Sequence, residues 1–163
     1  LPVMTIKVGD KVPSASLKEM GPDGPQEVST DELFAGKTVA LFAVPGAFTP
    51  TCSAKHLPGF VEKAGALKGK GVDEIVCLSV NDAFVMGAWG KDQKVGDKVR
   101  MMADGSADLT RKMGLELDLN PMGLGTRSRR YSMVVKDGKV AKLNLEEGGA
   151  YAVSDADTMF GQL

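Results

Sequence analysis

Short apolar runs alternate along the chain with apolar residues at helical spacing. Residues 38–44 and 74–80 are apolar on both faces, as strands inside a sheet are. A helical pattern follows each run: Leu57, Phe60, Val61, Ala64 and Leu67 after the first, and Phe84, Val85, Ala88 and Trp89 after the second. This order predicts two strand–helix units of an α/β sheet.

The remaining elements follow from turn and capping signals. The turn-rich residues 21–25 predict an opening hairpin, and the S-x-x-E spacing from Ser29 to Glu32 predicts a short helix before residue 38. In the second half we expect a strand at 99–103, a short helix ended by Gly114 and a long glycine-rich loop at 120–125. A hairpin over 131–145 and a C-terminal helix capped by Ser154 or Asp155 should follow. Without repeats or a linker, residues 1–163 are expected to form a single three-layer α/β domain with a mixed sheet.

Composition excludes several classes of function. Twenty basic residues balance 21 acidic ones, so no electrostatic argument favours nucleic acid or an anionic membrane surface. No apolar run approaches the roughly 18 residues that span a bilayer, which predicts a soluble protein. Two cysteines are too few for a secreted disulfide framework, so a reducing, intracellular compartment is expected. The chain begins Leu-Pro, which fits a removed presequence or a trimmed chain.

Cys52 is the candidate nucleophile. It lies where the apolar run ending at Val44 passes through a loop into a helix, and a helix start stabilises a thiolate. Pro45 and Pro50 restrict the loop, while Pro58 predicts a bend in the helix.

Other interpretations of these residues remain open. Cys52 could be a small buried side chain, or the sensor of a non-catalytic redox module. A zinc site would need four ligands, but two cysteines and His56 supply three. A cysteine hydrolase would need His56 as a base, although the spacing of four residues puts it on the helix of Cys52, where packing or hydrogen bonding is the simpler role.

The run VPGAFTPTC at 44–52 with HLPGF at 56–60 resembles the type II (atypical two-cysteine) peroxiredoxins, of the peroxiredoxin-5-like, plant or algal type. The resemblance continues through CLSVNDAFV at 77–85, SRRY at 128–131 and NLEEGG at 144–149, and so spans nearly the whole chain. It implies a thioredoxin-like fold with a mixed central β-sheet flanked by helices. It also implies an antioxidant thiol peroxidase that reduces hydrogen peroxide and alkyl hydroperoxides without metal, haem or flavin.

The resemblance assigns roles to individual residues. Cys52 corresponds to the peroxidatic cysteine, Thr49 and Pro45 to its pocket partners, and Arg130 to the pocket arginine. Arg127 and Arg129 compete for that last role, and in a strand starting near Ser128, Arg129 and Arg130 would face opposite ways.

The second cysteine, Cys77, is left open between two roles. It resembles the second cysteine of plant members, but it lies in an apolar strand. It either packs in the core or resolves the oxidised Cys52 as a disulfide. The residues at 149–154 lack the C-terminal cysteine of animal members.

Partners and compartment are also implied by the resemblance. It suggests a homodimer reduced by glutaredoxin with glutathione, or by thioredoxin. The stretches at 121–125 and 143–149 resemble plastid-type members most, which favours the chloroplast stroma, with the cytosol or mitochondrion as alternatives.

Overall fold

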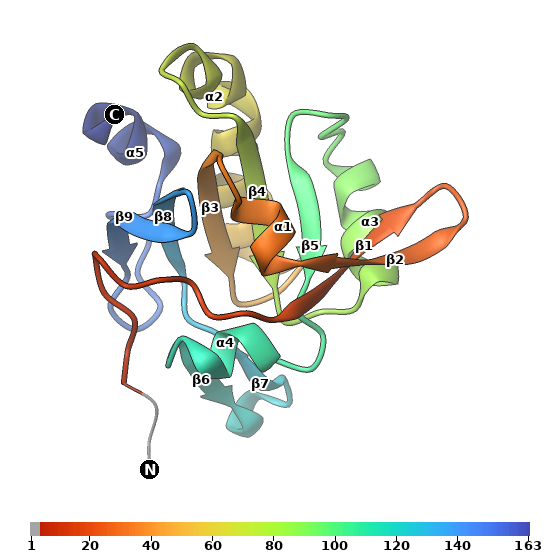
Figure 1. Ribbon diagram of the computed structural model, residues 1–163. Helices are drawn as coiled ribbons and strands as arrows, with labels where there is room; N and C mark the ends of the chain where they lie inside the picture. The colour runs from red at the N-terminus through yellow and green to blue at the C-terminus, as the bar shows by residue number, and fades with distance from the viewer. Residues whose placement is uncertain (1–3) are drawn as a thin grey trace.

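The computed structural model describes residues 4–163 and contains a seven-stranded mixed sheet in the order β2-β1-β5-β4-β3-β8-β9 (Figure 1). Its strands are β1 (Ser16–Gly21), β2 (Gly24–Ser29), β3 (Thr38–Val44), β4 (Glu74–Ser79), β5 (Arg100–Ala103), β8 (Tyr131–Lys136) and β9 (Lys139–Leu145). β3, β4 and β5 run parallel, and antiparallel pairs extend the sheet on both sides. The predicted thioredoxin-like fold with a mixed sheet is confirmed.

Helices cover both faces of this sheet. One face packs against α2 (Leu57–Gly69), α3 (Ala83–Asp92) and α5 (Ala156–Gln162), and the other against α1 (Thr30–Phe34) and α4 (Asp108–Lys112). Alternation along β3 divides its side chains between the two cores, with Phe42 facing α2 and Leu41 facing α1. The three layers expected from the sequence are therefore present.

The capping residues lie where the sequence places them. Ser29 accepts a hydrogen bond from the Glu32 amide at the start of α1, and Asp155 accepts one from the Thr158 amide at the start of α5. The turn at Asp137 and Gly138 has φ angles of 46° and 81°, as a tight hairpin requires.

The predicted apolar face of α3 is right at Trp89 and wrong at Phe84 and Ala88. Phe84 is 67% exposed, whereas the buried residues of the helix are Ala83, Met86, Trp89 and Gly90. A Cβ at Gly90 would lie 2.9 Å from the Met101 side chain, so the close helix–sheet contact needs glycine. A pattern that counts only large apolar residues misses a face partly made of glycine.

The loop expected at 120–125 is also different in the structure. β6 (Glu116–Leu119) and β7 (Gly125–Ser128) form a separate two-stranded sheet, and the 3₁₀ turn Asn120–Met122 connects them. Gly123, with φ of 76°, ends the turn, so the glycines that suggested an open loop serve a hairpin.

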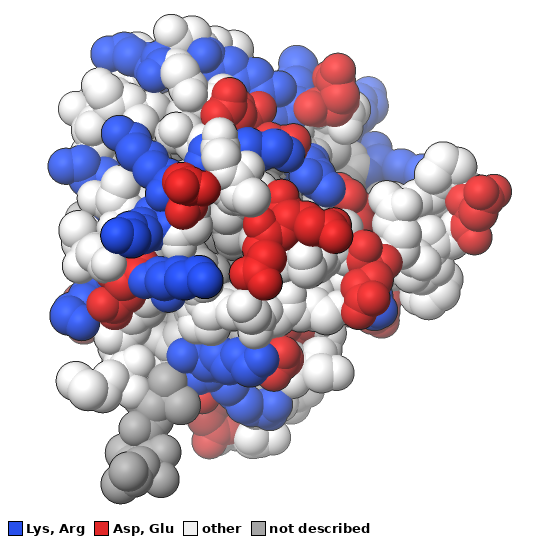
Figure 2. Space-filling model, in the orientation of Figure 1, with Lys and Arg blue, Asp and Glu red and all other residues white. Residues whose placement is uncertain are grey.

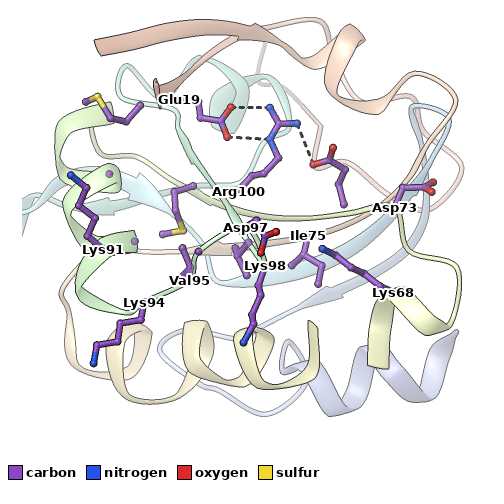
Figure 3. A pocket seen from close by; sticks show the side chains of 17 residues that line it. Glu19, Lys68, Asp73, Ile75, Lys91, Lys94, Val95, Asp97, Lys98 and Arg100 are labelled. Carbon is purple, nitrogen blue, oxygen red and sulfur yellow. Dashed lines mark hydrogen bonds and ion pairs between the residues drawn. The ribbon is translucent and has the colours of Figure 1, made fainter. Parts of the chain in front are cut away.

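Charged side chains of both signs are interspersed over the face shown in Figure 2. A surface hollow of about 510 Å³ lies at β5 and α3, where Arg100 bonds to Glu19 on β1 and Glu74 on β4 (Figure 3). Cys52 does not line this hollow.

Candidate functional site

The loop between β3 and Cys52 is held from two sides. The Ala47 amide donates to Asn81 Oδ1 (3.0 Å), and Arg127 Nη1 donates to the Pro45 carbonyl (3.3 Å). A Cβ at Gly46 would lie 2.9 Å from Arg127 Nη1, so a side chain there would displace the guanidinium from the Pro45 carbonyl. Phe48 has a positive φ of 65° and an exposed ring, a strained conformation that its neighbours must hold in place.

Cys52 lies in the first turn of a helix, as the sequence predicts. The amide of Ser53 bonds to the Thr49 carbonyl, and a π-helical turn follows over Cys52–His56. Leu57 closes that turn by bonding to the Cys52 carbonyl, and α2 continues through Pro58. Since proline has no N–H to donate and its ring crowds the carbonyl four residues earlier, the wider turn is the irregularity expected from Pro58.

Arg130 connects the sulfur to a histidine. Its Nη2 lies 3.2 Å from Cys52 Sγ, and its Nη1 lies 2.9 Å from His56 Nδ1. Cys52 and His56 have no exposed surface, and Arg130 is only 7% exposed. The guanidinium fork therefore spans two buried groups, one nitrogen bonded to each.

His56 is neutral and fully engaged. Its Nε2 lies 2.9 Å from the Ser154 carbonyl, while Nδ1 faces Arg130. Burial, together with the charge of Arg130, lowers the pKa of His56 to about 3. Neither ring nitrogen is free to take a proton from Cys52, so the geometry does not suit a cysteine hydrolase.

The three candidate arginines have different partners. Arg130 faces Cys52, Arg127 bonds to the carbonyls of Leu124 and Pro45, and Arg129 Nη2 donates to the Glu146 carbonyl. Arg129 and Arg130 diverge as expected, although they lie between β7 and β8 and not within a strand.

Thr49 and Pro45 lie in the loop just before Cys52. Within residues 4–163, the Thr49 hydroxyl donates to the Gly46 carbonyl (2.7 Å) and does not bond to Cys52. The Pro45 carbonyl is occupied by Arg127. Both residues border the site, but in this structure only Arg130 bonds to the sulfur.

Cys77 lies in β4 beside Phe42, on the same face of the sheet as Cys52. Both thiols are free and buried. Burial, and then the charge of Cys52, raise the pKa of the Cys77 thiol well above its ordinary value, while Arg130 opposes the shift. Cys77 is therefore held as a thiol in the folded state.

Sequence reasoning missed two contacts around Cys52. Trp89 Nε1 donates to Ser53 Oγ (3.0 Å) and so ties α3 to the π-helical turn. His56 orients Arg130, and the only sequence signal for this was its position one helical turn after Cys52.

No group of three or more His, Cys, Asp and Glu side chains in residues 4–163 is arranged to hold a metal ion. None of the helices there is long and apolar enough to cross a membrane.

Comparisons with known proteins agree with this geometry. The Redoxin family model matches residues 7–160. Chloroplastic peroxiredoxin-2E-2 of Oryza sativa subsp. japonica is 57% identical over 166 residues, covering 99% of this chain and 74% of the rice protein. Peroxiredoxin-2B of Arabidopsis thaliana is 54% identical over 159 residues, covering 97% of this chain and 98% of that protein.

A solved peroxiredoxin structure is also similar to this chain over almost its whole length. Reduced Prx3 of Vibrio vulnificus in complex with hydrogen peroxide has a TM-score of 0.94 at 47% identity, covering 97% of this chain and 99% of that one. A buried cysteine at a helix start beside an arginine thus occurs within a chain that matches peroxiredoxins along almost its whole length. The chain belongs to the type II peroxiredoxins of the redoxin family, and it is a thiol peroxidase.

Proposed function

We propose that Cys52 is the peroxidatic cysteine and that Arg130 and Thr49 stabilise the transition state of its reaction. The bond of 3.2 Å from Arg130 Nη2 to Cys52 Sγ carries this proposal. The thiolate attacks one peroxide oxygen, the S–O bond forms as the O–O bond breaks, and the leaving oxygen takes a proton to become water or alcohol. Cys52 is then a sulfenic acid.

The neighbouring groups suit this reaction. Negative charge develops on the leaving oxygen, so a fixed cation and a hydroxyl directed at it lower the barrier. In this proposal Thr49 exchanges its bond to Gly46 for one to the peroxide. Pro45 keeps the loop rigid, because its φ is fixed and its carbonyl is bonded to Arg127.

Removing the nucleophile or the guanidinium tests these roles. Cys52→Ser is expected to abolish peroxide reduction while the fold remains, because it removes the nucleophile and little volume. Arg130→Lys is expected to slow the peroxide step by roughly 100-fold, since a flexible ammonium cannot hold His56 and the sulfur together. Stopped-flow measurement of Cys52 oxidation reads the rate.

Arg129→Lys is the matched control, because within residues 4–163 the Arg129 side chain donates only to the Glu146 carbonyl and not to the sulfur. Its rate should stay close to that of the wild type. A larger loss in Arg129→Lys than in Arg130→Lys would contradict the assignment, and so would normal turnover in Cys52→Ser.

We propose that glutaredoxin with glutathione, or thioredoxin, is the reductant and that Cys77 packs in the core. The buried, protonated state of Cys77 supports the packing role. Glutathione can attack the sulfenic acid of Cys52 directly and release water, so this route needs no second cysteine.

A Cys77→Ser variant separates the two reductants. Turnover with glutaredoxin and glutathione should persist. Turnover with thioredoxin would depend on Cys77 only if a Cys52–Cys77 disulfide forms. Mass spectrometry after one equivalent of peroxide is expected to show sulfenic acid or a mixed disulfide at Cys52, and a dominant intramolecular disulfide would overturn the packing role.

We also propose a homodimer and a location in the chloroplast stroma. The exposed rings of Phe48 and Phe84 support a self-association surface. The ring centroids of Phe48 and Trp89 are 6.4 Å apart, and Trp89 and Phe84 both belong to α3, so Phe48 lies beside the helix that carries Phe84. Phe84→Glu should convert a dimer to a monomer in sedimentation velocity, and an unchanged mass would exclude this face.

The chloroplastic rice relative supports the proposed location in the chloroplast stroma, which chloroplast fractionation with protease protection would test.

A further inference from the structure

A buried carboxylate lies behind the arginine and histidine of the site. Glu146 follows β9 and is only 2% exposed. A single oxygen, Oε2, accepts four hydrogen bonds: from the amides of Ala152 (2.8 Å), Val153 (2.9 Å) and Ser154 (2.9 Å) and from Ser154 Oγ (2.7 Å). Burial opposes ionisation, but these bonds lower the pKa of Glu146 below its ordinary value. The carboxylate therefore fixes the segment 152–154.

That segment presents one carbonyl to His56. The Ser154 carbonyl lies 2.9 Å from His56 Nε2, and a carbonyl can only accept a hydrogen bond. The proton of the neutral imidazole must therefore be on Nε2, which leaves a lone pair on Nδ1. That lone pair accepts from Arg130 Nη1 at 2.9 Å, so the other terminal nitrogen, Nη2, points at Cys52 Sγ.

The backbone makes a second connection between Glu146 and Arg130. The Glu146 amide donates to the Arg130 carbonyl (3.0 Å). The residue that holds Ser154 is thus bonded directly to the main chain of the arginine.

We propose that Glu146 is a positioning residue of the peroxidase. By holding the Ser154 carbonyl it selects the Nε2–H tautomer of His56, and that tautomer holds the guanidinium of Arg130 in the orientation that meets the sulfur. The Glu146 side chain touches neither sulfur nor peroxide, so the effect of its carboxylate passes through Ser154, His56 and Arg130. This inference rests on the proposed role of Arg130.

The chain offers a direct spectroscopic test, because His56 is its single histidine. In protein labelled with ¹⁵N-histidine, the two ring nitrogens report the tautomer without any assignment problem. The variants are Glu146→Ala, which removes the acceptor, and Glu146→Gln, which keeps the shape but loses the charge. The control is Glu147→Gln, since Glu147 is exposed and its side chain makes no hydrogen bond within residues 4–163.

The wild type and Glu147→Gln should show the Nε2–H tautomer and equal rates of peroxide reduction. Glu146→Ala should populate the other tautomer and lose roughly 10-fold or more in the rate constant for peroxide, with Glu146→Gln in between. Circular dichroism identifies any variant that fails to fold, and if Glu146→Ala does so, Glu146→Gln carries the test.

Two results would overturn the inference. One is a Glu146 variant of lower stability that keeps both the wild-type tautomer and the wild-type rate, which would make Glu146 a structural clamp only. The other is a changed tautomer with an unchanged rate. Failure of the proposed function can be distinguished from failure of this inference. If Arg130 does not take part in the reaction, Arg130→Lys reduces peroxide at the normal rate, whichever tautomer the ¹⁵N signals of His56 show.

Discussion

At the scale of single residues, the site depends on one buried ring that stays neutral. His56 has no exposed surface, lies 4.9 Å from the ring of Phe42 and faces a guanidinium, so a second positive charge there would be both desolvated and repelled. Its pKa of about 3 keeps the imidazole neutral throughout the physiological range. An uncharged ring can accept from Arg130, whereas an imidazolium could not.

This shift predicts a loss of stability in acid. Below pH 6.5 the unfolded chain protonates His56, but the folded protein does not until about pH 3. The unfolded state then binds more protons, so stability falls as the pH falls through this window, by about 1.4 kcal/mol per pH unit. Between pH 7 and pH 5 this group should contribute a loss of about 2 kcal/mol.

Urea unfolding at both pH values, followed by circular dichroism, measures the change. The reference is His56→Gln, which has no titrating group at position 56. Carboxylates contribute equally to the pH dependence of the two proteins, so the difference between them is the contribution of His56. Identical pH dependence in the two would show that His56 does not remain neutral in the folded state.

At the scale of elements, α3 supports the turn that carries Cys52. Trp89 is buried, and the only hydrogen bond of its side chain within residues 4–163 is the one that Nε1 donates to Ser53 Oγ. The N-terminus of α3 is capped, because the Asp82 side chain accepts a hydrogen bond from the Val85 amide. The indole thus connects a well-capped helix to a π-helical turn.

Ser53→Ala should lower the free energy of unfolding by about 1–3 kcal/mol, because the buried indole N–H loses its acceptor. Hydrogen exchange at residues 52–57 should accelerate more than exchange in β4. Thr51→Ala is the control, since the Thr51 side chain makes no capping bond at the same turn. Equal stability in the two variants would show that the indole does not hold the turn.

At the scale of the whole molecule, the N-terminal hairpin is joined to the central sheet by an ion-pair cluster. Arg100 of β5 bonds to both carboxylate oxygens of Glu19 on β1, at 2.8 and 3.1 Å, and to Glu74 on β4 at 3.3 Å (Figure 3). These side chains are 17–29% exposed, so the contacts are screened less than surface pairs.

Arg100→Ala should lower the free energy of unfolding by about 1–3 kcal/mol, because the half-buried carboxylate of Glu19 loses its partner and Glu74 keeps only Lys37. Lys18→Ala is the matched control, since the Lys18–Glu27 pair is exposed and its atoms are 3.9 Å apart. Thermal unfolding compares the two. A loss in Lys18→Ala as large as that in Arg100→Ala would mean that the cluster contributes no more than a surface pair.

The sequence by itself determined the elements whose signals are local. Apolar runs defined β3 and β4, capping residues defined the starts of α1 and α5, and the order of strand, loop and helix placed Cys52 in a first helical turn. These features depend on residues within a few positions of one another, and neighbouring side chains carry that information.

Only the tertiary structure decided the contacts between distant segments. It shows that Arg130, the arginine that the resemblance favours, bonds to the sulfur, that Arg127 and Arg129 bond to backbone carbonyls, and that His56 bonds to the Ser154 carbonyl. It also turned the glycine face of α3 toward the sheet. Hydrogen bonds between residues 17 to 98 positions apart depend on how the segments cross in space, so no periodicity within one segment can predict them.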